Sequence, residues 1–249
     1  MALKTYTLDE VKNRFIGIIK NIEVSYNTHF PVFYAFFAKK TYLCSKILIM
    51  VFTDFKNLGQ VVKTYKIKVK NIYFLPNTIT QKAPISLHDD VRFTMEQGLY
   101  RASEIAIGEQ LIYPILKEVW KLHFVERMLL WSHASFAYDS KLSGIPDYLF
   151  AERTEYDNAV VGPPILVTIE AKKDNFEEGW GQCAAEMYAA LKANEGTKQT
   201  KVYGIVSNGD KWEFAHLQDD TFTKNIEYVD VLDLDKLFNA IHFILSESN

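Results

Sequence analysis

Two spacings of hydrophobic residues alternate along the chain, and they predict a mixture of helices and strands. Apolar residues at helical spacing predict helices at 7–22, 103–120, 176–192 and 233–245. Apolar or alternating segments rich in β-branched and aromatic residues predict strands at 30–37, 48–52, 65–74, 128–137, 147–150, 165–171, 202–207 and 211–217. Pro114 lies inside the second helix, where its missing N–H predicts a kink.

The second half of the chain gives the clearest indication of fold class. Residues 165–171 form an almost unbroken apolar run, which is typical of a central strand covered on both faces. A helix follows, with Asp174 or Asn175 as its N-cap, and then two strands that flank a compact turn at 208–210. The order helix, strands, helix, strands predicts an α/β fold with a central mixed β-sheet flanked by helices.

A polar, proline-bounded segment at 76–86 has the composition of a linker. We therefore expect an N-terminal α+β extension at 1–87 and a second domain at 88–249. Residues 1–88 carry 13 Lys+Arg and 4 Asp+Glu, a balance of +9, whereas the whole chain has a net charge of −3. This asymmetry suggests an anionic partner for the basic half, although surface lysines that only solvate the protein explain it as well.

Lysines also mark one face of the predicted strand 65–74. Lys66, Lys68 and Lys70 alternate with Ile67 and Val69, so the three lysines share a face. Such a face could follow a phosphate backbone. It is also typical of an edge strand that charge protects from further pairing.

The cysteines and the apolar segments indicate a cytoplasmic protein without a membrane span. Cys44 and Cys183 are isolated, which excludes a disulfide framework or a cysteine-based zinc site and suits a reducing compartment. The first residues contain no continuous apolar block of the kind found in a signal peptide. The most apolar stretch, 31–55, is interrupted by Lys39, Lys40 and Lys46, which would be costly inside a bilayer.

Three residues in the second half form a candidate catalytic site. Glu170 and Lys172 end the apolar strand two positions apart, so their side chains share a face, and Asp147 precedes a strand that can pair with it as a hairpin. Two carboxylates can hold Mg²⁺, the Ala171 carbonyl could add a third oxygen, and a lysine can orient or deprotonate a water.

The sequence context is what makes the Glu170–Lys172 triplet informative. An acidic residue two positions before a lysine occurs four times in the chain, so the pattern alone means little. Here it follows an apolar strand and precedes a capped helix. The plain alternative is a strand end that turns to solvent. Other chemistries fit poorly, because there is no glycine-rich phosphate loop, no helical His-x-x-x-His pair and no nucleophile elbow.

Four blocks of sequence carry a resemblance to a known family. They are Ser-Glu with Tyr-Pro-Ile-Leu, then Pro-Asp-Tyr-Leu, then Ile-Glu-Ala-Lys-Lys with Gly-Trp-Gly-Gln, and Tyr-Gly-Ile-Val-Ser-Asn-Gly-Asp-Lys-Trp. Residues 103–245 resemble the PD-(D/E)XK, or restriction-endonuclease-like, superfamily, and more closely its small uncharacterised bacterial members. Residues 1–90 lie outside the resemblance.

The resemblance adds helper residues to the site. It implies an acidic residue in the first helix that helps to hold metal, for which Glu104 is the best match and Glu109 the rival. It also implies that Gln182 in the second helix faces the site, where Gly179 and Gly181 would permit close packing of the helix on the sheet.

The resulting expectation is a nuclease that depends on Mg²⁺, with Mn²⁺ as an alternative ion. It would cleave phosphodiester bonds in nucleic acid, DNA before RNA, as a monomer or a homodimer. The competing hypotheses are an inactive nuclease-fold module that binds nucleic acid or a protein, and a structural or assembly subunit that binds neither metal nor nucleic acid.

Overall fold

The computed structural model describes residues 51–139, 142–155 and 157–248. The expected helix at 7–22 and strand at 30–37 lie outside these residues. The described strands are β1 Lys68–Ile72, β2 Met128–Ser132, β3 Phe136–Ala137, β4 Ser143–Gly144, β5 Tyr148–Glu152, β6 Ile165–Ala171, β7 Lys201–Ser207, β8 Lys211–Gln218, β9 Thr221–Asn225 and β10 Val229–Asp230. The helices are α3 Leu58–Tyr65, α4 Ile85–Gln97, α5 Glu104–Ile107, α6 Tyr113–His123, α7 Phe176–Ala193 and α8 Leu234–Glu247.

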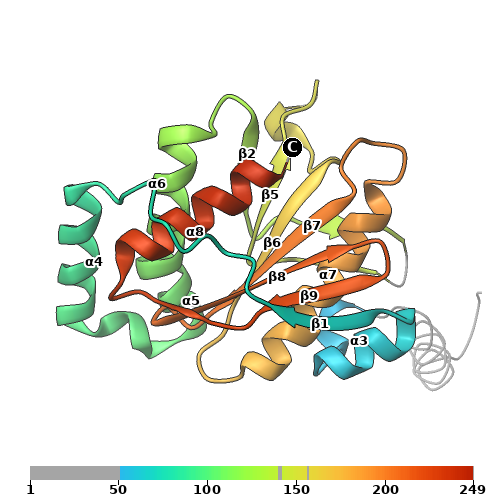
Figure 1. The fold of residues 1–249 in the computed structure, drawn as a ribbon, viewed down its shortest axis with the longest axis horizontal. Helices are drawn as coiled ribbons and strands as arrows, with labels where there is room; N and C mark the ends of the chain where they lie inside the picture. The colour runs from blue at the N-terminus through green and yellow to red at the C-terminus, as the bar shows by residue number, and fades with distance from the viewer. Residues whose placement is uncertain (1–50, 140–141, 156, 249) are drawn as a thin grey trace, which may run out of the picture. The chain divides into compact units, whose positions relative to one another are not determined.

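A mixed eight-stranded sheet forms the centre of the fold, as the sequence predicts (Figure 1). Its main path runs β1-β9-β8-β7-β6-β5-β2, and β10 pairs with β8 outside this path. Strands β6 and β7 are parallel, as are β1 and β9, whereas the other pairs are antiparallel. The strands β3 and β4 form a separate two-stranded sheet.

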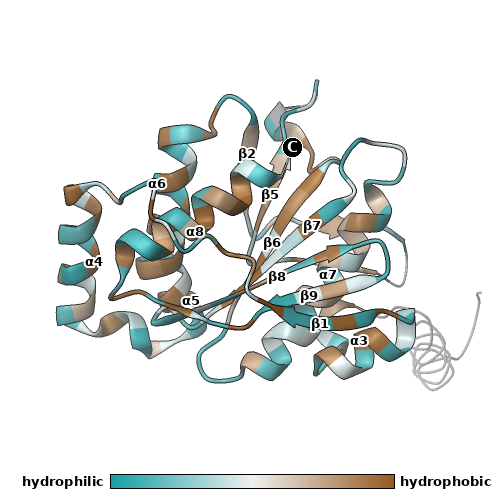
Figure 2. Cartoon of the chain, in the orientation of Figure 1, coloured by the Kyte–Doolittle hydropathy of each residue, from teal (hydrophilic) through white to brown (hydrophobic). Residues whose placement is uncertain are grey.

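Helices cover both faces of the central sheet. Side chains of α4, α6 and α8 share one buried hydrophobic cluster with the sheet, and side chains of α3 and α7 share the other. Hydrophobic residues run along the length of β6 (Figure 2), all of whose residues are buried. Burial on both faces accounts for the unbroken apolar sequence of this strand.

The described residues before residue 88, 51–87, belong to the same compact unit as residues 88–248. β1 pairs with β9 from Thr221 to Asn225, and α3 packs against α7. The boundary expected after residue 87 therefore falls inside the unit. The 76–86 segment contains no strand and only the first residues of α4, and Asn239 of α8 holds it through hydrogen bonds to Thr78, Thr80 and Gln81.

Several predicted elements differ in their details. The helix expected at 103–120 runs from Glu104 to His123. A kink is expected at Pro114, and the structure has a π-helical segment, Gly108–Ile112, that ends two residues before this proline. Proline has no N–H to offer the carbonyl four residues earlier, so the helical hydrogen bonds must shift there. The strand expected at 128–137 is divided into β2 and β3, because the backbone of His133 is left-handed with φ 48°.

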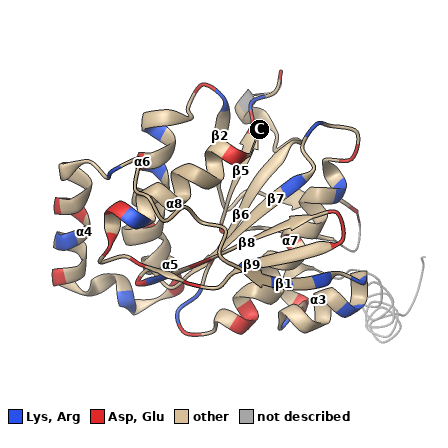
Figure 3. Ribbon diagram, in the orientation of Figure 1, with Lys and Arg blue, Asp and Glu red and all other residues tan. Residues whose placement is uncertain are grey.

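The strand expected at 65–74 is shorter than predicted. α3 continues to Tyr65, Lys66 ends it in a left-handed conformation with φ 58°, and β1 begins at Lys68. β1 lies at one end of the sheet order, and basic residues colour part of it blue in Figure 3. Lys68 of this strand forms an ion pair of 2.7 Å with Asp220. Among the strands that the structure describes, this lysine-rich segment is therefore at the edge of the sheet. Within the described residues, no helix is long and apolar enough to cross a membrane.

Candidate active site

Asp147 and Glu170 meet at one end of the sheet because β5 and β6 form the expected antiparallel pair. Tyr148 lies opposite Ile169, so the residues that follow this pair outward are Asp147 and Glu170. The backbone N–H of Ala171 donates a hydrogen bond of 2.8 Å to Asp147 Oδ2. This bond fixes the Asp147 carboxylate against the end of β6.

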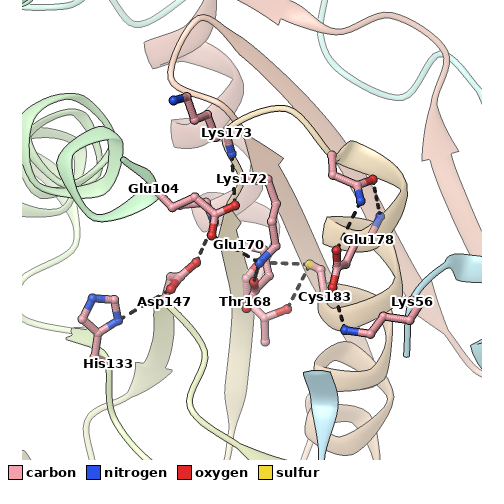
Figure 4. Close-up of polar contacts among 12 residues, drawn as sticks. Lys56, Glu104, His133, Asp147, Thr168, Glu170, Lys172, Lys173, Glu178 and Cys183 are labelled. Carbon is pink, nitrogen blue, oxygen red and sulfur yellow. Dashed lines mark hydrogen bonds and ion pairs between the residues drawn. The ribbon is translucent and has the colours of Figure 1, made fainter. Parts of the chain in front are cut away.

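Lys172 lies on the same face as Glu170, as the strand alternation predicts. The distance from Lys172 Nζ to Glu170 Oε2 is 3.4 Å. The backbone N–H of Lys172 donates to the carbonyl of Ser207 at 2.8 Å, which extends the pairing of β6 with β7 by one residue. The lysine is therefore held by backbone contacts on one side and by a carboxylate on the other (Figure 4).

Glu104 reaches the same place from the first turn of α5. The hydroxyl of Ser103 caps this helix by accepting a hydrogen bond of 3.1 Å from the N–H of Ala106. Glu104 Oε1 accepts a bond of 3.2 Å from the backbone N–H of Lys173, and Oε2 lies 4.0 Å from Lys172 Nζ. Of the two candidate acidic residues in the first helix, the structure brings Glu104 to Lys172.

The helix α7 covers the face of β6 on which Glu170 and Lys172 lie. Asn175 is its N-cap, since Asn175 Oδ1 accepts a hydrogen bond of 3.1 Å from the N–H of Glu178. A Cβ on Gly179 would lie 2.9 Å from Lys172 Cγ, so this glycine lets the helix approach the sheet as expected. Gly181 does not contribute to that approach, because it faces the backbone of Phe55 and Asn57 instead.

Gln182 is almost completely buried in α7, and its Oε1 has no hydrogen-bond partner among the described residues. One turn later, Glu186 is buried at 1% exposure, and its carboxyl group contacts that of Glu170. Glu186 is not among the residues that the sequence predicts at the site. Its signal is an acidic residue inside an otherwise apolar helix face, at the i+4 position from Gln182.

His133 is a second residue that the sequence reading did not place at the site. Its N–H donates a hydrogen bond of 2.9 Å to the carbonyl of Asp147, and its Nδ1 lies 3.7 Å from Asp147 Oδ1. The imidazole stacks on the ring of Tyr148 with centroids 5.8 Å apart. A sequence signal is hard to find here, because the contact depends on the left-handed turn after β2.

Burial and mutual repulsion raise the pKa values of the carboxyl groups. Burial first, and the charge of Asp147 second, raise the pKa of Glu170 to about 7, although its contacts with Glu186 and Lys172 oppose the shift. Burial raises the pKa of Asp147, against the hydrogen bond from Ala171. Burial and the neighbouring Glu170 raise the pKa of Glu186 well above its usual range.

The pKa of Lys172 shifts in the direction that keeps its side chain charged. Burial lowers its pKa, but the carboxylates of Glu170, Glu104 and Asp147 more than offset this effect, so the pKa lies above its ordinary value. A lysine in this state is an ammonium that donates hydrogen bonds. It is suited to orienting a water or neutralising a phosphate, and less suited to removing a proton.

The oxygen donors around Lys172 fit a hard divalent cation that is held only in part by protein. Within the described residues, no three His, Cys, Asp or Glu side chains are grouped closely enough to hold a metal ion. Mg²⁺ is commonly bound by one or two carboxylates, with waters and substrate phosphate as its other ligands. Asp147 and Glu170, with Glu104 nearby, meet that smaller requirement of one or two carboxylates. Glu170 and Glu104 also face the ammonium of Lys172.

Comparisons with known proteins add no further information on the site. No protein-family model matches the chain, and no curated protein matches its sequence.

Proposed function

We propose that this protein is a metal-dependent nuclease with a restriction-endonuclease-like core. The observation that carries the proposal is that Asp147, before β5, and Glu170 and Lys172, at the end of β6, come together at one end of the sheet. Two carboxylates beside a charged lysine are suited to phosphodiester hydrolysis, in which negative charge must be neutralised at the phosphoryl group. The element order helix, strands, helix, strands supports the same family.

Asp147 and Glu170 are the proposed metal ligands. The Ala171 N–H occupies Oδ2 of Asp147, so the proposed ligand atom is Oδ1, which lies 3.7 Å from His133 Nδ1. Glu104 has a half-exposed side chain and would complete the acidic rim on the solvent side. When bound, a divalent cation activates a water and stabilises charge on the phosphoryl oxygens.

Lys172 is proposed to orient the attacking water and to offset the charge of the phosphate. Its raised pKa supports these roles over that of a general base. DNA is the proposed substrate before RNA, and the lysines of the first 88 residues are proposed to help hold its backbone.

The test is cleavage of labelled single- and double-stranded DNA and RNA by the purified full-length protein. We expect cleavage with Mg²⁺ or Mn²⁺ and none with EDTA. Lys172→Ala and Asp147→Asn should each lower the rate by about 10²-fold or more, because each removes a group that acts on the developing charge. Lys198→Ala and Asp219→Asn, at exposed positions, are the matched controls and should cleave as the wild type does.

Cleavage that persists in Lys172→Ala at the wild-type rate would contradict the assignment of the site. Salt-sensitive binding of nucleic acid without cleavage under any ion condition would instead favour an inactive nuclease-fold module.

A further inference from the structure

Glu186 occupies a position in α7 where packing alone calls for an apolar side chain. Its neighbours in the helix are small or apolar and almost fully buried: Cys183, Ala184, Ala185, Met187, Ala189 and Ala190. A carboxyl group in such surroundings costs free energy unless it makes specific polar contacts. The position therefore calls for an explanation other than filling the core.

The polar contacts of Glu186 connect it with the candidate active site. Its carboxyl group contacts that of Glu170, while its Oε2 has no hydrogen-bond partner among the described residues. Gln182, on the same helix face, also has an oxygen without a partner. Two of the four such buried atoms in the described part of the chain thus lie on this one face of α7.

The placement of α7 brings this face over the end of β6. Gly179, one turn before Gln182, lies against both Lys172 and Val206, and Val206 is the β7 partner of Glu170. Side chains in a helix lean toward its N-terminus. Glu186 accordingly leans back toward Glu170 and Lys172 rather than toward the far end of the helix.

We propose that Glu186 is a positioning residue, which holds the side chain of Glu170 in the orientation needed to bind a divalent cation. This inference rests on the proposed function and adds a residue that acts through Glu170. Glu170 has Lys172 on one side, 3.4 Å away, and Glu186 on the other, so its carboxylate is held between two elements of the fold. Hydrogen-bond partners of metal ligands typically contribute 10–100-fold to metal affinity.

The test measures the binding of Mn²⁺ to the full-length protein. Binding is monitored by electron paramagnetic resonance, as the loss of the signal of the free ion. Glu186→Gln keeps a group that can hydrogen-bond to Glu170, and we expect it to bind Mn²⁺ as the wild type does. Glu186→Met keeps the volume but not the hydrogen bond, and its Mn²⁺ affinity should fall by about 10–100-fold. Met187→Leu, at a buried neighbouring position that faces Gly204, is the matched control.

Thermal unfolding separates positioning from a structural role. Glu186 Oε2 is buried without a hydrogen-bond partner among the described residues, and removing such a carboxyl group relieves the cost of burying it. We therefore expect Glu186→Met to unfold at the wild-type temperature or above while it binds Mn²⁺ more weakly. If Glu186→Met does not fold, Glu186→Ala serves in its place, because alanine suits this alanine-rich helix.

Wild-type Mn²⁺ affinity in a folded Glu186→Met or Glu186→Ala variant would overturn the inference and leave the proposed function intact. Equal weakening in Glu186→Gln and Glu186→Met would also overturn it, since the hydrogen bond would then not be the cause. If the wild-type protein binds no Mn²⁺, the metal site of the proposed function fails, and the positioning role falls with it.

Discussion

The substitution Gly181→Ala tests how closely α7 is held against the segment that precedes α3. Gly181 lies inside α7, where alanine is ordinarily the better helix residue by about 1 kcal/mol. In this structure, however, an added Cβ would lie 2.6 Å from the backbone nitrogen of Asn57 and closer still to the carbonyl oxygen of Phe55. Real side chains do not come so near to backbone atoms.

The expected change in the free energy of unfolding of Gly181→Ala follows from these two opposing effects. Inserting a methyl group into a well-packed site typically costs about 1–3 kcal/mol, and the upper part of this range applies because backbone atoms cannot rotate away. Subtracting the helix-propensity gain of about 1 kcal/mol leaves a net loss of about 1–2 kcal/mol. For a protein of this size, each kcal/mol lowers the unfolding temperature by about 2–4 °C.

The assay is thermal and urea unfolding of the variant beside a control with the same substitution. Gly59→Ala is that control, because Gly59 is also helical but its added Cβ would meet only the side-chain oxygen of Asn57, at 3.1 Å. We expect Gly181→Ala to unfold at a lower temperature and Gly59→Ala to stay within about 0.5 kcal/mol of the wild type. A Gly181→Ala variant at least as stable as the wild type would refute the close contact between α7 and residues 55–57.

Two further predictions concern stability away from the site. Burial lowers the pKa of His216 from 6.5 to about 4, so the unfolded chain binds the proton more tightly, and up to about 3 kcal/mol of stability should be lost as the pH falls from 6.5 to 4. His216→Phe should lose less stability over this range in urea unfolding, and an equal loss would count against the burial effect. Asn239→Ala should destabilise the protein by about 2–3 kcal/mol in the same assay, because Asn239 Oδ1 accepts hydrogen bonds from the backbone of Thr80 and Gln81. The exposed control Asn71→Ala should change stability little, and a similar loss in both variants would contradict the prediction.

The parts of the fold that the sequence predicts well are those with strong local signals. β6 is found at the predicted residues because an unbroken apolar run is unambiguous when it is bounded by polar residues. α7 begins where its cap predicts, and the β7–β8 hairpin closes over the turn at 208–210. The convergence of Asp147, Glu170 and Lys172 could also be anticipated, since it follows from strand alternation and one hairpin.

The elements that the sequence reading missed have weak local signals. α4 was not predicted because its apolar pattern is poor, with Ile85 and Phe93 exposed. β9 is a short strand of polar and apolar residues, and it is stabilised by pairing with both β8 and β1. The left-handed turn at His133 depends on the hydrogen bond to Asp147, which is a contact between separate strands. Tertiary interactions determine all three, and a local pattern does not contain them.

Several departures from ordinary local rules come together at the end of β6, and this supports a functional role independently of any motif. Glu186 is an acid inside an apolar helix face, Gln182 leaves a buried oxygen without a partner, and His133 has a left-handed backbone beside Asp147. Each departure has a cost in stability, and such costs are retained where function requires them. A chain with an apolar residue at position 186 should fold at least as well. The simplest reason for a carboxyl group there is therefore that it positions the side chain of Glu170. Because these costs concern folding, metal binding by the Glu186 variants tests the proposed site independently of cleavage assays.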